Sequence, residues 1–261
     1  MVVLAARMVG LYLLWRVLKL LLSLLMSTKY YDSFYASTID DLSTAYNNSV
    51  RDYKLELFRQ VASSLKSIGG DVLEIGVGTG ANLEFYPKGC CLIALDPSSE
   101  MRQLFEAKNK KYSHVNIKRF IQGCAEDLKE IPDSSIGVIV CTKVMCSVRN
   151  KRKALLEFKR VLKPEGICYF LEHVAAPCGT WQRTIQDMVE WSGLWAALHA
   201  GCSCNCELWK YIHEAGFRKV TYRQFTPPKP QKTSWLSPWL LYSSHFLGYV
   251  QKAAIQSKKP D

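Results

Sequence analysis

The amino-acid sequence predicts an α/β fold: a doubly wound, mostly parallel sheet with helices on both faces. Three observations carry this prediction. Short apolar runs alternate with segments of helical periodicity, a glycine-rich turn follows the first apolar run of the body, and an acidic residue closes the second run. Alternating strands and helices are typical of a parallel sheet. With 261 residues and 48% hydrophobic composition, the chain is long enough for one domain with a buried core.

The first segment, residues 1–28, is strongly apolar. Residues 2–26 hold ten leucines and no acid, but the longest uncharged runs are only 8–15 and 20–28. A membrane-spanning helix normally needs about 20 mostly apolar residues. Arg16 and Lys19 are three positions apart, so on a helix they share one face and can reach the same water layer. We therefore expect an N-terminal hydrophobic membrane-anchoring helix that lies in one leaflet.

Two alternatives to this anchor remain open, a cleaved signal peptide and a buried structural helix. Arg16 would interrupt the apolar core of a signal peptide, and the stretch "SLLMSTKYY" offers no clear small-x-small cleavage site.

The net charge of +11 is concentrated at the two ends of the chain. Residues 1–31 carry four bases and no acid, and residues 218–261 carry eight bases and one acid, whereas 32–217 are neutral. A nucleic-acid enzyme would more often have basic and aromatic residues spread over its body. Basic ends favour a membrane lipid surface as partner and no nucleic acid, although the charge alone fits solvated termini equally well.

The remaining elements follow in order along the chain. Residues 29–49 form a polar linker and cap, and the main domain is expected over 50–261. Helical spacing runs over 50–67 and ends at Gly69-Gly70. Further helices are expected at 81–86, 100–110 and 151–162, and strands at 71–75, 91–95, 117–121, 136–141 and 167–172. Residues 214–225 indicate a helix end, a turn and a strand, and 245–253 indicate the last strand.

The glycine-rich turn lies in "VLEIGVGTG", residues 72–80. Gly76, Gly78 and Gly80 allow positive φ and a close approach of the backbone to a ligand. Asp96 closes the next apolar run, twenty residues after Gly76. A carboxylate at this place can accept both ribose hydroxyls of an adenosine.

Glu74, inside the first run, distinguishes between possible cofactors. A dinucleotide would bring an anionic pyrophosphate to this turn, and a nearby carboxylate would repel it. S-adenosylmethionine has no phosphate and carries a sulfonium and an ammonium, which Glu74 would attract. The G-x-G-x-G spacing also departs from the G-x-G-x-x-G of dinucleotide sites. The pattern therefore favours S-adenosyl-L-methionine, although Glu74 could instead only cap the turn.

Four stretches, "VLEIGVGTGANLEFYP", "LIALDPS", "GCAEDL" and "EFKRVLKPEGICYFLEHV", resemble successive motifs of class I S-adenosylmethionine-dependent methyltransferases. The leucine-rich N-terminus, "VCT-x-V-x-CSV" and "FY-F-x-EHVAA" are similar to the methyltransferase-like seven group of membrane-associated thiol S-methyltransferases. The resemblance covers roughly residues 45–255.

This resemblance implies a Rossmann-like doubly wound, mostly parallel seven-stranded sheet whose last strand is antiparallel. It implies methylation of small lipophilic thiols, at the endoplasmic reticulum membrane and lipid droplets, with the catalytic domain facing the cytosol. Another small acceptor (a phenol, amine, quinone or arsenite) is an alternative, and so is a non-catalytic coat protein of lipid droplets or membranes.

The resemblance also implies roles for individual cofactor-binding residues. Gly76, Gly78 and Gly80 would lie beside the methionine part with Glu74 near its amino group, and Asp96 would hold the ribose. Ala125 and Glu126 would border adenine. Cys141 and Thr142 would form the floor below the sulfonium. Many members have Gly-Asp-Ala where this chain has Gly123-Cys124-Ala125, so the side chain that contacts adenine stays open.

The acceptor end is expected beyond the fifth strand. The insert 174–204 is rich in large apolar residues, and Trp181, Met188, Trp191 and Trp195 are candidates for a substrate pocket under a lid. The alternative is a helix that merely covers the sheet edge. His173, at the end of the fifth strand, is the candidate general base for a thiol acceptor, unless it only bonds a neighbouring loop.

The ten cysteines are most simply reduced and buried. Cys202, Cys204 and Cys206 have C-x-C-x-C spacing, whereas structural zinc sites prefer C-x-x-C or wider. No metal site is expected from this spacing, and a metal or arsenite role for the three thiols is the weaker alternative.

Overall fold

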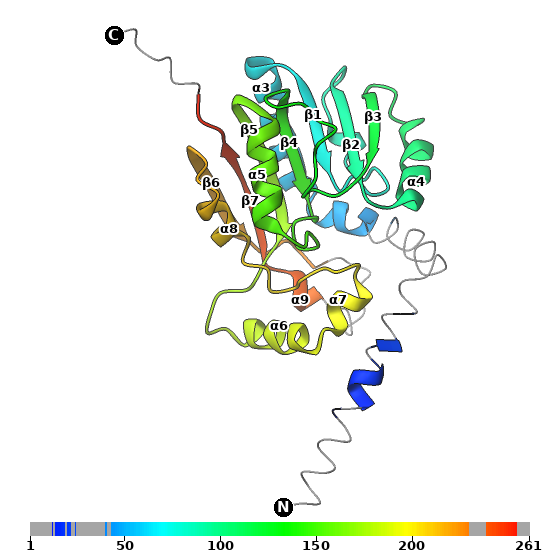
Figure 1. Ribbon diagram of the computed structural model, residues 1–261, viewed down its shortest axis with the longest axis vertical. Helices are drawn as coiled ribbons and strands as arrows, with labels where there is room; N and C mark the ends of the chain where they lie inside the picture. The colour runs from blue at the N-terminus through cyan, green and yellow to red at the C-terminus, as the bar shows by residue number, and fades with distance from the viewer. Residues whose placement is uncertain are drawn as a thin grey trace, which may run out of the picture.

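A computed structural model describes residues 12, 14–18, 20, 21, 24, 40, 43–229 and 239–254. Its centre is a seven-stranded sheet in the order β3-β2-β1-β4-β5-β7-β6 (Figure 1). The strands are β1 (Asp71–Ile75), β2 (Cys91–Asp96), β3 (Asn116–Gln122), β4 (Ile136–Thr142), β5 (Leu162–His173), β6 (Lys219–Phe225) and β7 (His245–Gln251). β1 to β5 pair in parallel, and β7 runs antiparallel to both β5 and β6. The expected seven-stranded, mostly parallel sheet with an antiparallel last strand is therefore confirmed.

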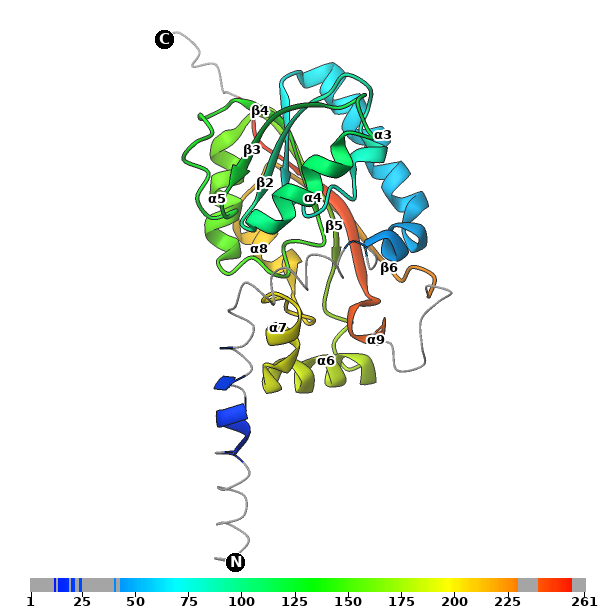
Figure 2. The same cartoon turned by 90° about the vertical axis from the view of Figure 1, so that its right-hand side faces the viewer.

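Helices cover both faces of the sheet. The longer ones are α3 (Arg51–Ile68), α4 (Ser99–Asn109), α5 (Lys151–Val161), α6 (Trp181–Ser192) and α8 (Leu208–Glu214), and the short ones are η1 (Leu83–Phe85), α7 (Leu194–Leu198) and α9 (Trp239–Tyr242). Side chains of α3 and α4 pack on one face of the sheet, and those of α5 and α8 pack on the other. Figure 2 shows α6, α7 and α9 below the body of the sheet, at the end where the parallel strands finish.

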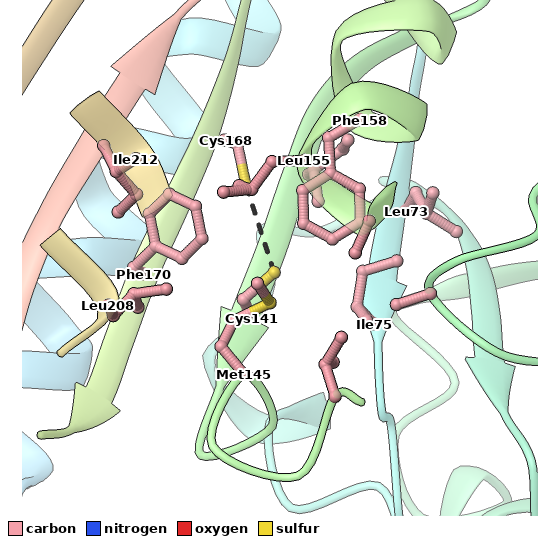
Figure 3. Packing of buried hydrophobic residues seen from close by; sticks show 14 of the residues in the cluster. Leu73, Ile75, Cys141, Met145, Leu155, Phe158, Cys168, Phe170, Leu208 and Ile212 are labelled. Carbon is pink, nitrogen blue, oxygen red and sulfur yellow. Dashed lines mark hydrogen bonds between the residues drawn. The ribbon is translucent and has the colours of Figure 1, made fainter. Parts of the chain in front are cut away.

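The central strands are contiguous apolar runs because both of their faces are buried. Every residue from Ile136 to Cys141 is buried. On the α5 and α8 face, Leu73, Ile75, Phe158 and Phe170 pack with their neighbours into one core (Figure 3). Burial of each such side chain stabilises the fold by about 1.5–3 kcal/mol.

Two expected elements differ clearly in the structure, and the other expected strands and helices begin and end within two residues of the observed bounds. The helix expected at 81–86 is only the single 3₁₀ turn η1, because Asn82 turns its side chain inward to bond Glu74 and Thr142. The fifth strand begins at Leu162, five residues earlier than expected, because Ile136 of β4 already pairs with Leu162 there.

The expected anchor, 1–28, and the linker, 29–49, lie largely outside the described residues. The described part of 12–24 is helical, and residues 43–49 form a helical stretch ahead of α3. Within the part of the chain that the structure describes, no helix has the length and apolar character needed to cross a membrane.

Candidate active site

The glycine-rich turn lies at the C-terminal end of β1, where β1 lies between β2 and β4. All three glycines have positive φ, with Gly76 at 64° and Gly78 at 53°. A Cβ at Gly76 would lie 2.3 Å from Val144 Cγ2, so the strand end can approach the β4 loop only without a side chain. A Cβ at Gly78 would meet no atom within 4 Å. The main chain at Gly78 therefore borders open space at this edge of the parallel sheet. A ligand can approach the backbone closely there.

Asp96 lies at the end of β2 and faces this turn. Its Oδ2 accepts the Gly78 amide at 2.9 Å and its Oδ1 accepts the Ser98 amide at 3.0 Å. Burial raises the pKa of Asp96, and these two amide bonds oppose the rise. Each carboxylate oxygen can accept a second hydrogen bond. Asp96 is therefore oriented by the backbone and retains acceptor capacity for two ligand hydroxyls, as the ribose assignment requires.

Glu74 lies on β1 and is almost completely buried. Its Oε1 accepts Asn82 Nδ2 at 2.7 Å, and its Oε2 accepts the Tyr86 hydroxyl at 2.8 Å. Burial raises the pKa of Glu74 to about 7, against the lowering effect of Tyr86, Asn82 and Lys54. This carboxyl group is therefore poised between its neutral and ionised forms, and a cation next to it would favour the ionised form.

A buried lysine faces the same network. Lys54 Nζ donates to Asn47 Oδ1 at 2.6 Å and also to Asn82 Oδ1. Burial lowers the pKa of Lys54 to about 7, and the negative charge of Glu74 opposes this effect most strongly. Asn82 thus bridges an acid and a base, and both are held away from water.

Lys54 was missed in the sequence prediction, although a signal existed. On α3 it takes a place in the apolar stripe, four residues after Val50 and three before Leu57, where a charged residue is unexpected. Asn82 and Tyr86 were likewise missed, and both lie in the quoted "GANLEFYP" stretch.

The two residues expected to form the floor of the site point to opposite faces. Thr142 Oγ1 accepts Asn82 Nδ2 at 2.8 Å, so Thr142 joins Glu74 and Asn82. The Cys141 thiol lies instead in the core, with its Sγ 3.9 Å from Cys168 Sγ (Figure 3). Neighbouring residues of a strand alternate between faces, so only one of this pair can face α3 and the glycine turn. The structure does not bring the Cys141 thiol to the site.

The turn after β3 joins the same edge. The Gly123 amide donates to the Asp96 carbonyl at 3.1 Å, which ties this turn to the end of β2. Ala125 is buried. Glu126 Oε1 accepts the Asn150 amide at 2.9 Å and so holds the residue before α5. Three consecutive strand ends therefore meet where the cofactor residues were expected, although the structure occupies one Glu126 oxygen with a structural bond.

A second group of side chains gathers at the ends of β4 and β5. His173 Nε2 lies 3.2 Å from Cys202 Sγ, and Cys202 Sγ lies 3.4 Å from Cys146 Sγ. Trp195 donates its indole N–H to the same Cys202 sulfur at 3.4 Å. All four side chains are buried. Cys146 comes two residues after Val144, and Gly76 packs against Val144. This group of side chains therefore lies near the glycine turn.

Two neighbouring residues, Glu172 on β5 and Cys204, make other contacts. Both Glu172 oxygens accept the Val144 amide, at 3.1 and 3.0 Å, so Glu172 does not orient His173. Cys204 Sγ contacts the Gln186 carbonyl at 3.5 Å and Glu190 Oε2 at 3.6 Å. The C-x-C-x-C spacing therefore does not gather three thiols.

The insert after β5 presents most of its apolar residues outward. On α6, Trp181, Met188 and Trp191 are 62%, 66% and 78% exposed, whereas Gln186 is buried and bonds the Ala176 amide and the Leu241 carbonyl. Trp195, on α7, is 6% exposed and reaches Cys202. Of the four expected substrate-binding residues, only Trp195 faces the candidate site.

Comparison with known proteins gives consistent similarities. Residues 73–170 match a family described as Methyltransferase domain. The chain is 36% identical to human Thiol S-methyltransferase TMT1A over 212 residues, 79% of this chain and 81% of that protein. It is 34% identical to human Thiol S-methyltransferase TMT1B over 222 residues, 84% of this chain and 86% of that protein.

Solved structures show the same fold. A SAM-dependent methyltransferase from Methanosarcina mazei superimposes with a TM-score of 0.55 at 18% identity, covering 70% of this chain and 92% of that one. A SAM-dependent methyltransferase from Thermotoga maritima, described as a possible histamine N-methyltransferase, gives 0.54 at 18% identity, covering 84% and 97%.

Proposed function

Because the chain belongs to the thiol S-methyltransferase family of TMT1A and TMT1B, we propose that it moves a methyl group from S-adenosylmethionine to the sulfur of small lipophilic thiols. The observation that carries the proposal is the buried network of Glu74, Asn82 and Lys54 beside Asp96 and the glycine turn. This network offers an acid, a base and a hydroxyl acceptor at one edge of the sheet.

The cofactor is S-adenosylmethionine, and the residues fit it. Asp96 would accept the ribose hydroxyls, and the open main chain at Gly78 would allow the amino-acid part to approach. The amino-acid end of this cofactor carries one ammonium and one carboxylate. Glu74 can face the ammonium and Lys54 the carboxylate, so each buried charge would gain an opposite one. Thr142 would border this end through Asn82.

Adenine contacts stay part of the proposal. Ala125 offers an apolar wall at the turn after β3, and Glu126 has acceptor capacity beyond its bond to Asn150. When bound, S-adenosylmethionine supplies an electrophilic methyl group on a sulfonium. The protein's task is then to hold an acceptor sulfur in line and to keep water out.

The acceptor would lie at the buried group around Cys202. Trp195 and the sulfurs of Cys146 and Cys202 give soft, polarisable surroundings that suit a lipophilic thiol. His173 lies in the same group and is the candidate for the residue that handles the acceptor proton. Its ring nitrogen already contacts Cys202, so this structure gives it a thiol as partner.

An acceptor panel tests the proposal. Purified protein with labelled S-adenosylmethionine should methylate an alkanethiol at least about a hundredfold faster than the alcohol and amine of the same carbon skeleton. Near neutral pH only the thiol forms some nucleophilic anion, whereas the alcohol stays neutral and the amine is protonated and has no free lone pair. Equal rates for all three acceptors, or a clear preference for the amine or a phenol, would contradict thiol specificity.

We also propose that the protein lies on a lipid surface, at the endoplasmic reticulum membrane and lipid droplets with the catalytic domain toward the cytosol. The support is an apolar surface of two parts. The described helical residues of 12–24 expose Leu14, Val17, Leu18, Leu20, Leu21 and Leu24. On α6, Trp181, Met188 and Trp191 are exposed, and the Trp191 ring stacks on Trp15 with 5.9 Å between centroids.

The direction of α6 strengthens this argument. Two of its polar residues face the body of the protein: Gln186 is buried, and Arg183 pairs with Glu207. A helix that turns its apolar face outward would be unfavourable in water, and a membrane interface is the environment in which it is stable. The domain plan that follows is an anchor at 1–28, a linker and cap at 29–49, and the methyltransferase domain at 50–261.

A further inference from the structure

The group Cys146, His173 and Cys202 has the composition and geometry of a metal site. One ligand atom from each lies within 4.8 Å of the other two, and all three side chains are buried. The residues come from three separate places: the loop after β4, the end of β5 and the loop after α7. Three buried soft donors from unrelated segments meet here, and no disulfide joins them.

The distances are close to those around one zinc ion. With bonds of about 2.3 Å to sulfur and about 2.0 Å to nitrogen, tetrahedral zinc separates two sulfurs by about 3.8 Å and a sulfur from a nitrogen by about 3.5 Å. The corresponding separations here are 3.4 Å between Cys146 and Cys202 and 3.2 Å between Cys202 and His173. Outward shifts of a few tenths of an ångström would suffice to enclose an ion.

The surroundings of the three donors also suit a metal. The Trp195 indole N–H points at the Cys202 sulfur, and a donor of this kind stabilises a metal-bound thiolate. His173 Nδ1 is buried and has no hydrogen-bond partner among the described residues. The polar contacts of the ring among the described residues are with the thiols of Cys202 and Cys146, and coordination of a ring nitrogen would replace weak contacts by a strong bond. Cysteine and histidine together favour zinc over magnesium or calcium.

We propose that Cys146, His173 and Cys202 bind one Zn²⁺ ion and that its fourth position takes the sulfur of the acceptor thiol. Among the described residues no fourth histidine, cysteine or carboxylate joins the group. Three protein ligands with one open position characterise catalytic rather than structural zinc sites. The second half of this proposal rests on the proposed function, because it needs a thiol acceptor.

The chemistry balances without a further reagent. The acceptor thiol loses its proton to solvent as its sulfur binds the ion, which makes the thiolate available at neutral pH. The thiolate sulfur then forms a bond to the methyl carbon of S-adenosylmethionine. The methyl–sulfonium bond breaks, and its electron pair stays on the departing sulfur, which becomes a neutral thioether. His173 then acts as a ligand, and no general base is needed.

Metal content of the purified full-length chain tests the site. Elemental analysis should find about one zinc per chain, and cobalt substitution should give a thiolate-to-cobalt charge-transfer band in the near ultraviolet. Cys146→Ser and Cys202→Ser should each weaken metal binding by at least about 100-fold, since even outer-shell changes cost 10–100-fold. Cys178→Ser, at an exposed cysteine, should keep both metal and band.

Two controls keep the test decisive. S-adenosylmethionine binding, measured by calorimetry on the same preparations, reports whether each variant is folded. If the serine variants do not fold, removal of the metal from the parent with a chelator and reconstitution with zinc replaces them.

The possible outcomes separate the two halves of the proposal. A folded parent that takes up no zinc or cobalt, or that carries a Cys146–Cys202 disulfide after reducing purification, overturns the site. A zinc-loaded parent whose thiol methylation survives complete metal removal overturns the acceptor role. Zinc binding without methylation of any thiol contradicts the proposed function and leaves the metal site standing.

Discussion

Glu74→Gln should strengthen the folded state while weakening cofactor binding. The substitution keeps the shape of the side chain, and glutamine can still accept from Asn82 and pair with the Tyr86 hydroxyl. It removes the charge that the proposed function assigns to the ammonium of the cofactor. The buried charge of Glu74 destabilises the free protein but stabilises the cofactor complex. Removing it should therefore raise the unfolding free energy and lower the cofactor affinity.

The magnitude follows from the pKa of Glu74, which burial raises from 4.5 to about 7. A raised acid pKa means that stability is complete below the unfolded pKa and is lost as pH rises through the folded one. Parent and variant should therefore be about equally stable below pH 4.5. The parent should lose about 3 kcal/mol of unfolding free energy relative to the variant between pH 4.5 and pH 7, and the difference should stay constant above.

Lys54 does not reverse this expectation. Burial lowers the pKa of Lys54 to about 7 in the parent, and the charge of Glu74 opposes this effect, so the pKa of Lys54 should be lower still in the variant. Well above pH 7, Lys54 is therefore mostly neutral in both proteins. Its attraction to an ionised Glu74 matters only near neutral pH, where it reduces the difference. The clearest comparison is therefore between pH 5 and pH 8.5.

Urea unfolding at a series of pH values measures the stability difference, and calorimetry at pH 8 measures cofactor affinity. The affinity of Glu74→Gln for S-adenosylmethionine should fall at least about tenfold, since a charge-assisted hydrogen bond contributes about 1.5–3 kcal/mol. Glu84→Gln is the matched control, because Glu84 lies on η1 in a partly exposed pair with Arg51. A variant less stable than the parent at pH 8.5, or one with parental affinity, would refute this account of Glu74.

Three other predictions follow from the structure. Asp96→Ala should lower S-adenosylmethionine affinity at least about tenfold while circular dichroism stays native, because two charge-assisted hydrogen bonds are lost; parental affinity would remove Asp96 from the ribose site. The double change Met188→Glu and Trp191→Glu should reduce flotation with anionic vesicles by about tenfold or more, because each added charge is repelled by about 1 kcal/mol. Leu156→Glu, at an exposed leucine of α5, is its control, and equal losses in both would exclude a specific face. Gln186→Leu should lower the unfolding free energy by about 2–3 kcal/mol by leaving a buried backbone amide and a partly buried carbonyl unpaired, and an unchanged urea midpoint would contradict that assignment.

The sheet could be predicted from sequence because its strands are buried on both faces. β4 is apolar over nearly its whole length, so the length of the apolar run predicted its bounds. β2 ends at Asp96, and this acidic residue marked its end in the sequence. Helix ends were less predictable. Residues 81–86 have helical composition, but the side chain of Asn82 finds better partners in Glu74 and Thr142 than a helix could offer.

The site was predictable only where it is local in sequence. Gly76, Glu74 and Asp96 belong to short motifs, and the structure brings them together. Cys146 and Cys202 are 56 residues apart, and no periodicity shows that their sulfurs touch. Their meeting depends on how three loops pack at one edge of the sheet.

The orientation of α6 was also beyond sequence reasoning. Its tryptophans and methionine form an apolar stripe that suits a buried pocket wall as well as an exposed surface. Gln186 decides the orientation, because its amide bonds the Ala176 amide and the Leu241 carbonyl and so holds this side of α6 against the body of the protein. Those partners lie in other segments of the chain and become visible only in the fold.

The most direct test of the central claim is the identity of the product. The purified chain is incubated with S-adenosylmethionine deuterated at the methyl group and with an alkanethiol, and the products are resolved by mass spectrometry. The account predicts a deuterated methyl thioether and an equal amount of S-adenosylhomocysteine, both at least about tenfold lower in Asp96→Ala when the cofactor is kept below its Kd. A parent protein that binds S-adenosylmethionine yet forms no more thioether than Asp96→Ala would contradict the claim that this chain methylates thiols.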